Sequence, residues 1–88
     1  MDKISDYLCV DLETTGLNPK TDKIIEIGAV KVRDGKIEDT FQALINPCRP
    51  LEERITELTG ITDDMLFDKP VINKVLPDFL RFAGEDIL

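Results

Sequence analysis

The sequence predicts an α/β fold in which an antiparallel meander of three strands is followed by helices. Apolar residues alternate with period two over the first half of the chain, and they recur with helical spacing over the second half. Asp34-Gly35 separates two of the expected strands as a two-residue hairpin turn, because Asp and Gly tolerate the positive φ of a type I′ turn. These observations order the elements as β-β-β-α-α.

The first strand is expected over residues 7–13. Alternation places the carboxylates of Asp11 and Glu13 on one face at the end of this strand. The opposite face is apolar and carries Leu8, Val10 and Leu12. Turn residues dominate positions 14–22, which we expect to form a loop.

The second and third strands are expected over residues 23–33 and 36–45. The second is apolar on both faces, which is typical of a strand in the interior of a sheet. The third is apolar on one face only, which favours an outer position. Its apolar face is expected to carry Ile37, Phe41, Ala43 and Ile45.

Two short helical segments are expected next. Leu51, Ile55 and Leu58 recur at i, i+4 and i+7 as the apolar stripe of a helix that Gly60 ends. Residues 62–66 are expected to form one more helical turn, at whose start the acidic residues Asp63 and Asp64 lie.

The last helix is expected to begin at Asn73 or Lys74 and to end at Gly84. This start leaves Pro77 in the first turn, where its missing N–H costs little. Residues 85–88 are expected to begin a fourth strand, which would pair parallel to an earlier strand through a crossover.

Composition excludes several kinds of site. The 88 residues carry a net charge of −7 and no histidine, so the chain cannot assemble a Ser-His or Cys-His pair. Two cysteines without histidine cannot fill a four-coordinate zinc site. Cys9 and Cys48 are expected to be reduced thiols of a cytoplasmic protein, since no signal segment or membrane span is evident. The acidity argues against a basic nucleic-acid patch and leaves acidic metal sites open.

The best candidate for chemistry is Asp11-Leu12-Glu13. Two carboxylates about 6.6 Å apart along one strand face can reach one hard metal ion or bridge a pair of ions. Thr14, Thr15 and Gly16 follow at once and offer backbone N–H groups and a close backbone approach. The spacing alone is equally compatible with two acids on the solvent face of a strand, and both interpretations stay open at this level.

The wider string around these acids resembles a known family. Residues 10–19, VDLETTGLNP, are similar to the first motif of the DEDD 3′–5′ exonucleases, in particular the DEDDh branch. KIIEIGAV at 23–30 and LTGITDDML at 58–66 are similar to later segments of that superfamily. Within it, the segments most resemble the proofreading epsilon subunit of bacterial DNA polymerase III and the exonuclease domain of C-family replicative polymerases. The resemblance implies an RNase H-like fold.

The resemblance also implies the chemistry of a nuclease. It assigns Asp11 and Glu13 as catalytic metal ligands that hold two Mg²⁺ or Mn²⁺ ions in a complete domain, with weak or partial binding by these two acids alone. It implies hydrolysis of phosphodiester bonds at single-stranded DNA 3′ ends, with RNA as an alternative substrate and a DNA polymerase as a partner.

Substrate contacts are implied for the segments that follow the acids. The backbone N–H of Thr14, with Thr15 and Gly16 beside it, would meet the terminal 3′-hydroxyl. Leu17 and Leu58 would pack on the terminal base, with Thr59 next to them. Ordinary packing or turn roles are the alternative for these three residues.

The family's second and third acidic motifs and its histidine do not occur in this chain. We therefore expect residues 1–88 to be the N-terminal portion of one exonuclease domain, truncated at the start of the fourth strand and inactive alone. An unpaired edge at Tyr7–Leu12 is expected to favour self-association. The rival hypothesis is a non-catalytic acidic interaction or regulatory module built on the same half-fold.

Overall fold

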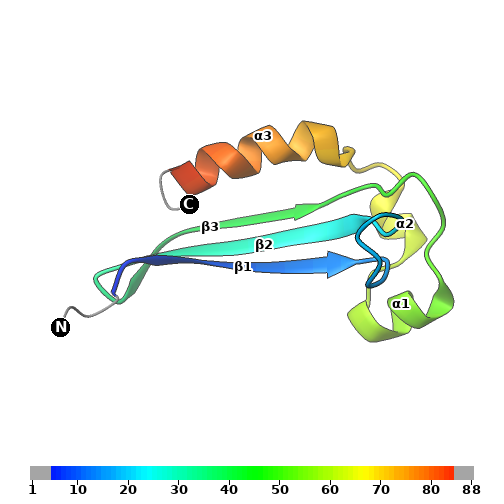
Figure 1. The fold of residues 1–88 in the computed structure, drawn as a ribbon, viewed down its shortest axis with the longest axis horizontal. Coiled ribbons are helices and arrows are strands. Elements are labelled where there is room, and N and C mark those ends of the chain that lie inside the picture. Colours follow the sequence, from blue (N-terminus) through cyan, green and yellow to red (C-terminus); the bar gives the residue numbers. More distant parts are fainter. Residues whose placement is uncertain (1–4, 85–88) are drawn as a thin grey trace.

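The structure, a computed structural model, describes residues 5–84. Three antiparallel strands are followed by helices, as predicted, in a molecule that measures 47 × 24 × 23 Å (Figure 1). There are three helices and not two, because the helical turn expected at 62–66 forms a short helix of its own. The expected fourth strand falls on residues 85–88, outside the described part. Within the described residues, no helix is long and apolar enough to cross a membrane.

The sheet has the strand order β1-β2-β3, with β1 at Tyr7–Thr14, β2 at Ile24–Arg33 and β3 at Lys36–Leu44. The interior position of β2 and the outer position of β3 are confirmed. Asp34 and Gly35 have φ angles of 52° and 73°, as the type I′ turn requires. Among the described strands, β1 pairs on one side only, so its outer edge is open.

One hydrophobic cluster lies between the sheet and α3, which runs from Ile72 to Ala83 (Figure 1). Its buried members are Ile27, Ala29, Ile45, Val75 and Phe79. The Phe41 ring meets the Phe79 ring edge-on at 5.6 Å between centroids. Helix α3 covers β2 and β3 more fully than β1, and Val10 and Leu12 of β1 therefore stay 47% and 46% exposed.

A second cluster anchors the two short helices, α1 at Glu53–Thr59 and α2 at Asp63–Leu66. Its buried members are Ile25, Ile55, Ile61 and Leu66. A bulge explains why Ile25 belongs here. Glu13 pairs with Glu26 while Thr14 pairs with Ile24, which leaves Ile25 as the extra residue of β2. Bulges bend and twist a strand locally, and this one lies directly after the acidic pair.

Three expectations about the helices and strands are wrong: the start of α3, the burial of Leu58 and the burial of Ile37. Helix α3 begins at Ile72, so Pro77 lies in its second turn. The burial of Val75 and Phe79 on this helix offsets the one backbone hydrogen bond that Pro77 cannot donate. Pro77 and Asn73 are both exposed, so water can reach the carbonyl of Asn73, which lacks this bond. Leu58 is not part of the buried stripe, since it is 81% exposed.

Ile37 is the third exception. Val32 pairs with Ile37 while Lys31 pairs with Asp39, so Glu38 is an extra residue in β3. This bulge shifts the alternation, and Ile37 faces away from Phe41 and is 70% exposed.

Candidate functional site: an acidic sheet face and the loop that follows it

Asp11 and Glu13 stand on the sheet face that α3 does not cover. Their register partners are Gly28 and Glu26, whereas the residues of β2 that pack against α3 are Ile27 and Ala29. Directly opposed residues of an antiparallel pair share a face. The predicted placement of both carboxylates on one face is therefore confirmed, and Glu26 joins them there.

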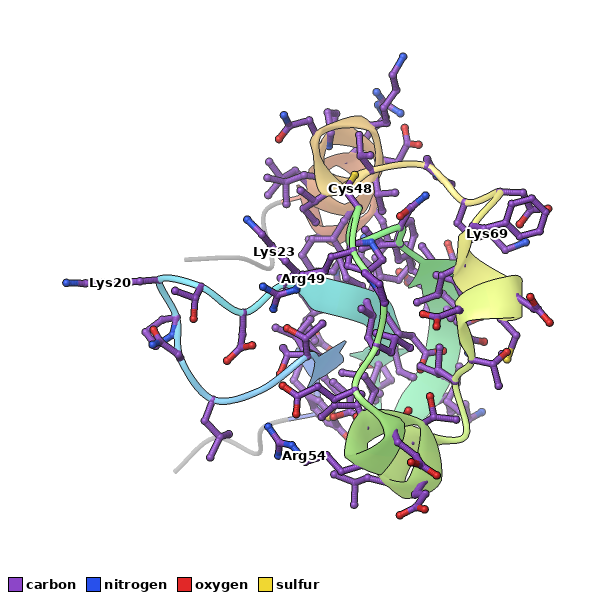
Figure 2. The ribbon with its side chains drawn as sticks, turned by 90° about the vertical axis from the view of Figure 1, so that its right-hand side faces the viewer. Lys20, Lys23, Cys48, Arg49, Arg54 and Lys69 are labelled. Carbon is purple, nitrogen blue, oxygen red and sulfur yellow. The ribbon has the colours of Figure 1, made fainter. Side chains whose placement is uncertain are left out.

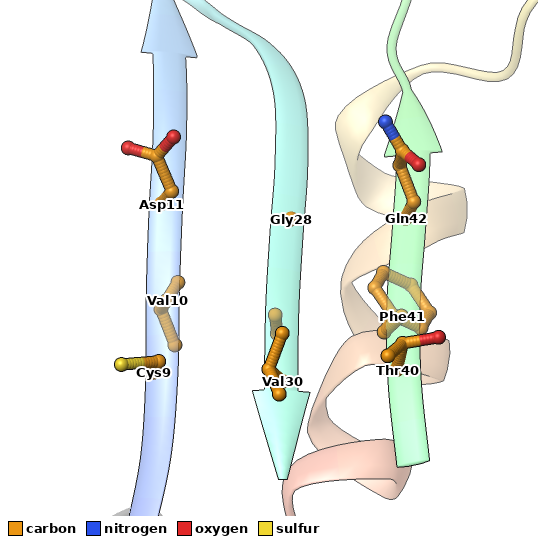
Figure 3. A pocket seen from close by; sticks show the side chains of 9 residues that line it. Cys9, Val10, Asp11, Gly28, Val30, Thr40, Phe41 and Gln42 are labelled. Carbon is orange, nitrogen blue, oxygen red and sulfur yellow. The ribbon is translucent and has the colours of Figure 1, made fainter. Parts of the chain in front are cut away.

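Gly28 opens a hollow beside Asp11. In Figure 3, with α3 behind the strands, Asp11 of β1 and Gln42 of β3 stand on either side of Gly28. A Cβ at Gly28 would meet only the carbonyl oxygen of Asp11, at 3.9 Å, so the glycine leaves space instead of relieving a clash. The hollow has a volume of about 540 Å³. Cys9, a free thiol, is exposed at its rim.

The carboxylates of Asp11 and Glu13 have no partner in the part of the chain that the structure describes. Over residues 5–84, neither takes part in a side-chain hydrogen bond or an ion pair. The neighbouring Glu26 differs, because its Oε2 accepts a hydrogen bond of 2.8 Å from Nε2 of Gln42. The described part of the chain holds no group of three or more acidic or sulfur ligands placed to share one metal ion. Asp11 and Glu13 thus offer free hard oxygen atoms to an external cation, but only as an incomplete ligand set.

The loop that follows β1 wraps around the carboxylate of Asp22. Oδ1 of Asp22 accepts a hydrogen bond of 2.8 Å from Oγ1 of Thr15, and Oδ2 accepts one of 2.9 Å from the backbone N–H of Asn18. The hydrogen bond from Asn18 is the main reason that the pKa of Asp22 lies below its usual value, and the Thr15 hydroxyl and the Arg49 guanidinium lower it further. Asp22 therefore stays ionised and holds the loop closed.

The candidate substrate residues of this loop have different environments. Thr15 is buried, and its hydroxyl also accepts a hydrogen bond of 2.9 Å from the backbone N–H of Lys23, so its side chain is structural. The hydroxyl of Thr14 donates to the carbonyl of Gly16 at 2.7 Å. Leu17 is a fully exposed residue of the loop. A fully exposed leucine contributes nothing to the core and is free to contact a ligand.

The end of α1 carries the other candidates. The hydroxyl of Thr59 donates to the carbonyl of Ile55 at 2.8 Å and accepts from the N–H of Ile61 at 3.1 Å, so it helps to end the helix. Gly60 ends α1 with a left-handed φ of 78°, as predicted. The side chain of Leu58 projects into solvent. The loop after β1 and helix α1 lie at the same end of the sheet (Figure 1).

Asp22 and Arg49 were not predicted from the sequence as parts of the site. Nη2 of Arg49 donates to Oγ1 of Thr15 at 2.6 Å and to Oδ1 of Asp22 at 3.0 Å. Figure 2 shows Arg49 extending from the chain before α1 toward the loop that carries Lys20. Within the loop, the only feature of the sequence that pointed to a role was an acidic residue, Asp22, after a run of turn residues. No sequence pattern connects it to an arginine 27 residues later.

Comparisons with known proteins agree with this arrangement. The model of the exonuclease family (RNase T) matches residues 8–88. The PolC-type DNA polymerase III of Bacillus subtilis strain 168 is 55% identical over 82 residues, which cover 93% of this chain and 6% of that protein. The PolC-type DNA polymerase III of Thermotoga petrophila is 50% identical over 82 residues, with the same coverage. The chain thus spans about 6% of the length of these curated relatives.

Solved structures show the same fold. The nuclease domain of 3′hExo, a DEDDh family member bound to rAMP, superposes with a TM-score of 0.80 at 28% identity, covering 96% of this chain and 46% of that chain. Exonuclease X in complex with 5′ overhanging duplex DNA gives a TM-score of 0.73 at 37% identity, covering 83% of this chain and 42% of that chain. The three-stranded sheet with its helices is therefore the RNase H-like arrangement of DEDDh exonucleases.

Proposed function

The chain belongs to the exonuclease family, and we propose on that basis that it supplies the N-terminal portion of a 3′–5′ exonuclease domain. The domain would hydrolyse phosphodiester bonds at single-stranded DNA 3′ ends and proofread for a PolC-type replicative polymerase in the cytoplasm. The observation that carries the proposal is a pair of carboxylates, Asp11 and Glu13, that share one open sheet face and have no partner among residues 5–84. The 50–55% identity to PolC-type polymerases supports the choice of DNA.

Asp11 and Glu13 fit the family's requirement for divalent metal. Both are hard oxygen donors on one face, and neither is neutralised by a basic side chain within the described residues. In the complete domain they would share two Mg²⁺ or Mn²⁺ ions with acids from other segments, since the chain covers less than half of the solved exonucleases. Bound metal would supply charge stabilisation at the scissile phosphate and a more acidic attacking water.

The residues of this chain would bind and orient the terminal nucleotide. The backbone N–H of Thr14 is assigned to the 3′-hydroxyl, whereas the space left by the missing side chain of Gly16 is taken by the Asp22 carboxylate and not by substrate. Leu17 and Leu58 present exposed apolar surface on which the terminal base can stack, with Thr59 beside them. The contact of an apolar surface with a base is tolerant of base identity, as a proofreading exonuclease requires.

The test uses the full-length protein that carries residues 1–88. Asp11→Ala and Glu13→Ala should each abolish digestion of a labelled single-stranded 3′ end while the thermal unfolding midpoint stays unchanged. Asp78→Ala is the matched control, because Asp78 is an exposed acid on α3, on the other side of the sheet. Digestion that is unaffected by Asp11→Ala would show that this motif is not part of the catalytic site, whereas a full-length protein without 3′ exonuclease activity would favour the non-catalytic module.

RNA is the second candidate substrate, because the nuclease domain with the TM-score of 0.80 was solved with rAMP bound. Digestion of matched DNA and RNA oligonucleotides by the same protein separates the two. We expect the higher kcat/KM on DNA.

A further inference from the structure

We propose that Thr15, Asp22 and Arg49 form a positioning junction that sets how the loop bearing Leu17 faces the helix bearing Leu58. The junction would thereby determine how well the 3′-terminal base is held. This inference rests on the proposed function, because it concerns the same nucleotide site. None of the three junction residues is assigned to the reacting atoms, so they are positioning residues.

The loop after β1 is held in one conformation by Asp22. Asp22 accepts hydrogen bonds from Thr15 at the start of the loop and from Asn18 near its middle, and its own N–H donates to the carbonyl of Asn18 at 2.8 Å. A Cβ at Gly16 would lie 2.5–2.9 Å from three side-chain atoms of Asp22. The carboxylate thus fills the space above Gly16, and the backbone that leads to Leu17 has little room to move.

The same loop is also connected to the segment that leads into α1. Arg49 lies three residues before the N-cap of α1, Glu52, and its Nη2 reaches Thr15 and Asp22 across 34 and 27 residues of sequence. Within residues 5–84, every hydrogen bond between the loop and segment 49–60 comes from Arg49. The hydrogen bond to Thr15 is partly buried, since Thr15 is only 5% exposed, whereas the bond to Asp22 is an exposed ion pair of 3.0 Å. Arg49 therefore provides the hydrogen bonds that connect the loop after β1 to the segment that leads into α1.

This connection has a consequence for a bound base. Leu17 is 100% exposed and Leu58 is 81% exposed, so neither side chain is held by packing against the core. Their relative placement depends on how the backbones that carry them are anchored. A displacement of about 1 Å in a positioned group can cost about 10²-fold in rate. Loss of the Arg49 hydrogen bonds should therefore weaken binding of the 3′-terminal base without removing any group that takes part in the reaction.

The experiment compares two 3′ ends in the full-length protein that carries this chain. One single-stranded oligonucleotide ends in a normal nucleotide, and the other ends in an abasic nucleotide that has the same sugar and phosphate. Arg49→Met should lower kcat/KM on the normal end about 10-fold to 100-fold, mainly through KM, and should change the abasic end much less. Leu17→Ala should show the same selective loss, and the double variant should lose little more than either single variant.

Matched variants separate positioning from general destabilisation. Arg81→Met removes an arginine that bridges Asp78 at 3.0 Å on α3, and it should leave both substrates unaffected. Thr15→Ser keeps the hydroxyl and should retain the preference for the normal end, whereas Thr15→Val should lose it. Thr15→Val also provides the test if Arg49→Met fails to fold.

Three outcomes would overturn the inference. Equal loss on both substrates in the Arg49→Met and Thr15→Val variants would show a merely structural role, and no loss on either would show that the Arg49 hydrogen bonds are dispensable. Full additivity with Leu17→Ala would show that the junction does not act through the loop. A wild-type protein without 3′ exonuclease activity would refute the proposed function itself, which distinguishes the two failures.

Discussion

Glu13 of β1 lies directly opposite Glu26 of β2, so two carboxylates of like charge share one face at the end of the strand pair. Gln42 of β3 donates a hydrogen bond to Glu26 but none to Glu13. Like charges opposed across an antiparallel pair destabilise the sheet. A divalent cation bound near Glu13 would relieve this repulsion, which links the stability of the sheet to metal.

Glu26→Gln should therefore stabilise the chain when no divalent metal is present. The substitution removes one of the opposed charges while its amide oxygen can still accept the hydrogen bond from Gln42. We expect a gain of about 0.2–1 kcal/mol in the free energy of unfolding, measured by urea denaturation in EDTA. Glu57→Gln, at an exposed position on α1, is the control and should have almost no effect. A loss of stability in Glu26→Gln would contradict the repulsion.

Residues 1–88 should bind Mn²⁺ or Mg²⁺ weakly. Affinity rises with the number of charged oxygen ligands, and the family's second and third acidic motifs, which would complete the set begun by Asp11 and Glu13, do not occur in this chain. We expect a dissociation constant no tighter than about 10⁻⁴ M by calorimetry, and loss of binding in Asp11→Ala. Tight binding that survives Asp11→Ala would place the metal elsewhere.

Asp22 should make the stability of the chain depend on pH in the acid range. Its folded-state pKa lies below the unfolded value because Asn18 and Thr15 donate hydrogen bonds to the ionised form. The unfolded chain therefore binds more protons near that range. The stability that Asp22 contributes is complete above its unfolded pKa of about 3.9 and is lost as the pH falls through the folded pKa.

The measurement for Asp22 is the difference in free energy of unfolding between the wild type and Asp22→Asn at several pH values. The difference should be largest above about pH 5 and should shrink toward pH 3. The other carboxylates titrate alike in both proteins and cancel. A difference that stays constant over this range would show that the charge of Asp22 is irrelevant to the fold.

Residues 1–88 alone should show no measurable exonuclease activity. They supply Asp11 and Glu13 but lack the family's second and third acidic motifs, and they have no histidine to accept the proton of the attacking water. Loss of a positioned general base costs about 10²–10⁴-fold before any loss of metal is counted. A net charge of −7 also repels phosphate. EDTA-sensitive 3′-end cleavage by the purified 88-residue chain, lost on Asp11→Ala, would show that the machinery lies within it.

The open edge of β1 should drive self-association of the 88-residue chain. Tyr7, Val10 and Leu12 are each between 43% and 47% exposed, and this edge pairs with no strand among the described residues. Exposed apolar edges pair with other chains. We expect a dimer or larger species by light scattering at high protein concentration. A monomer whose Tyr7–Leu12 amides resist hydrogen exchange would contradict this expectation.

Local patterns were sufficient to predict the strands and the acidic pair. Alternation alone places Asp11 and Glu13 on one face, because side chains on a strand must point to opposite sides in turn. The Asp34-Gly35 turn and the Gly60 helix end follow from backbone conformations that few other residues adopt. Each of these features depends on the residues of one short segment.

Placement that depends on distant residues was decided only by the tertiary structure. The start of α3 ahead of Pro77 depends on what Val75 and Phe79 bury, and the exposure of Leu58 depends on how α1 docks on Ile25. The contact of Arg49 with Thr15 and Asp22 joins segments 27 and 34 residues apart. Hydrogen bonds and packing across such separations follow from how the elements meet in space, and no pattern within either segment specifies its partner.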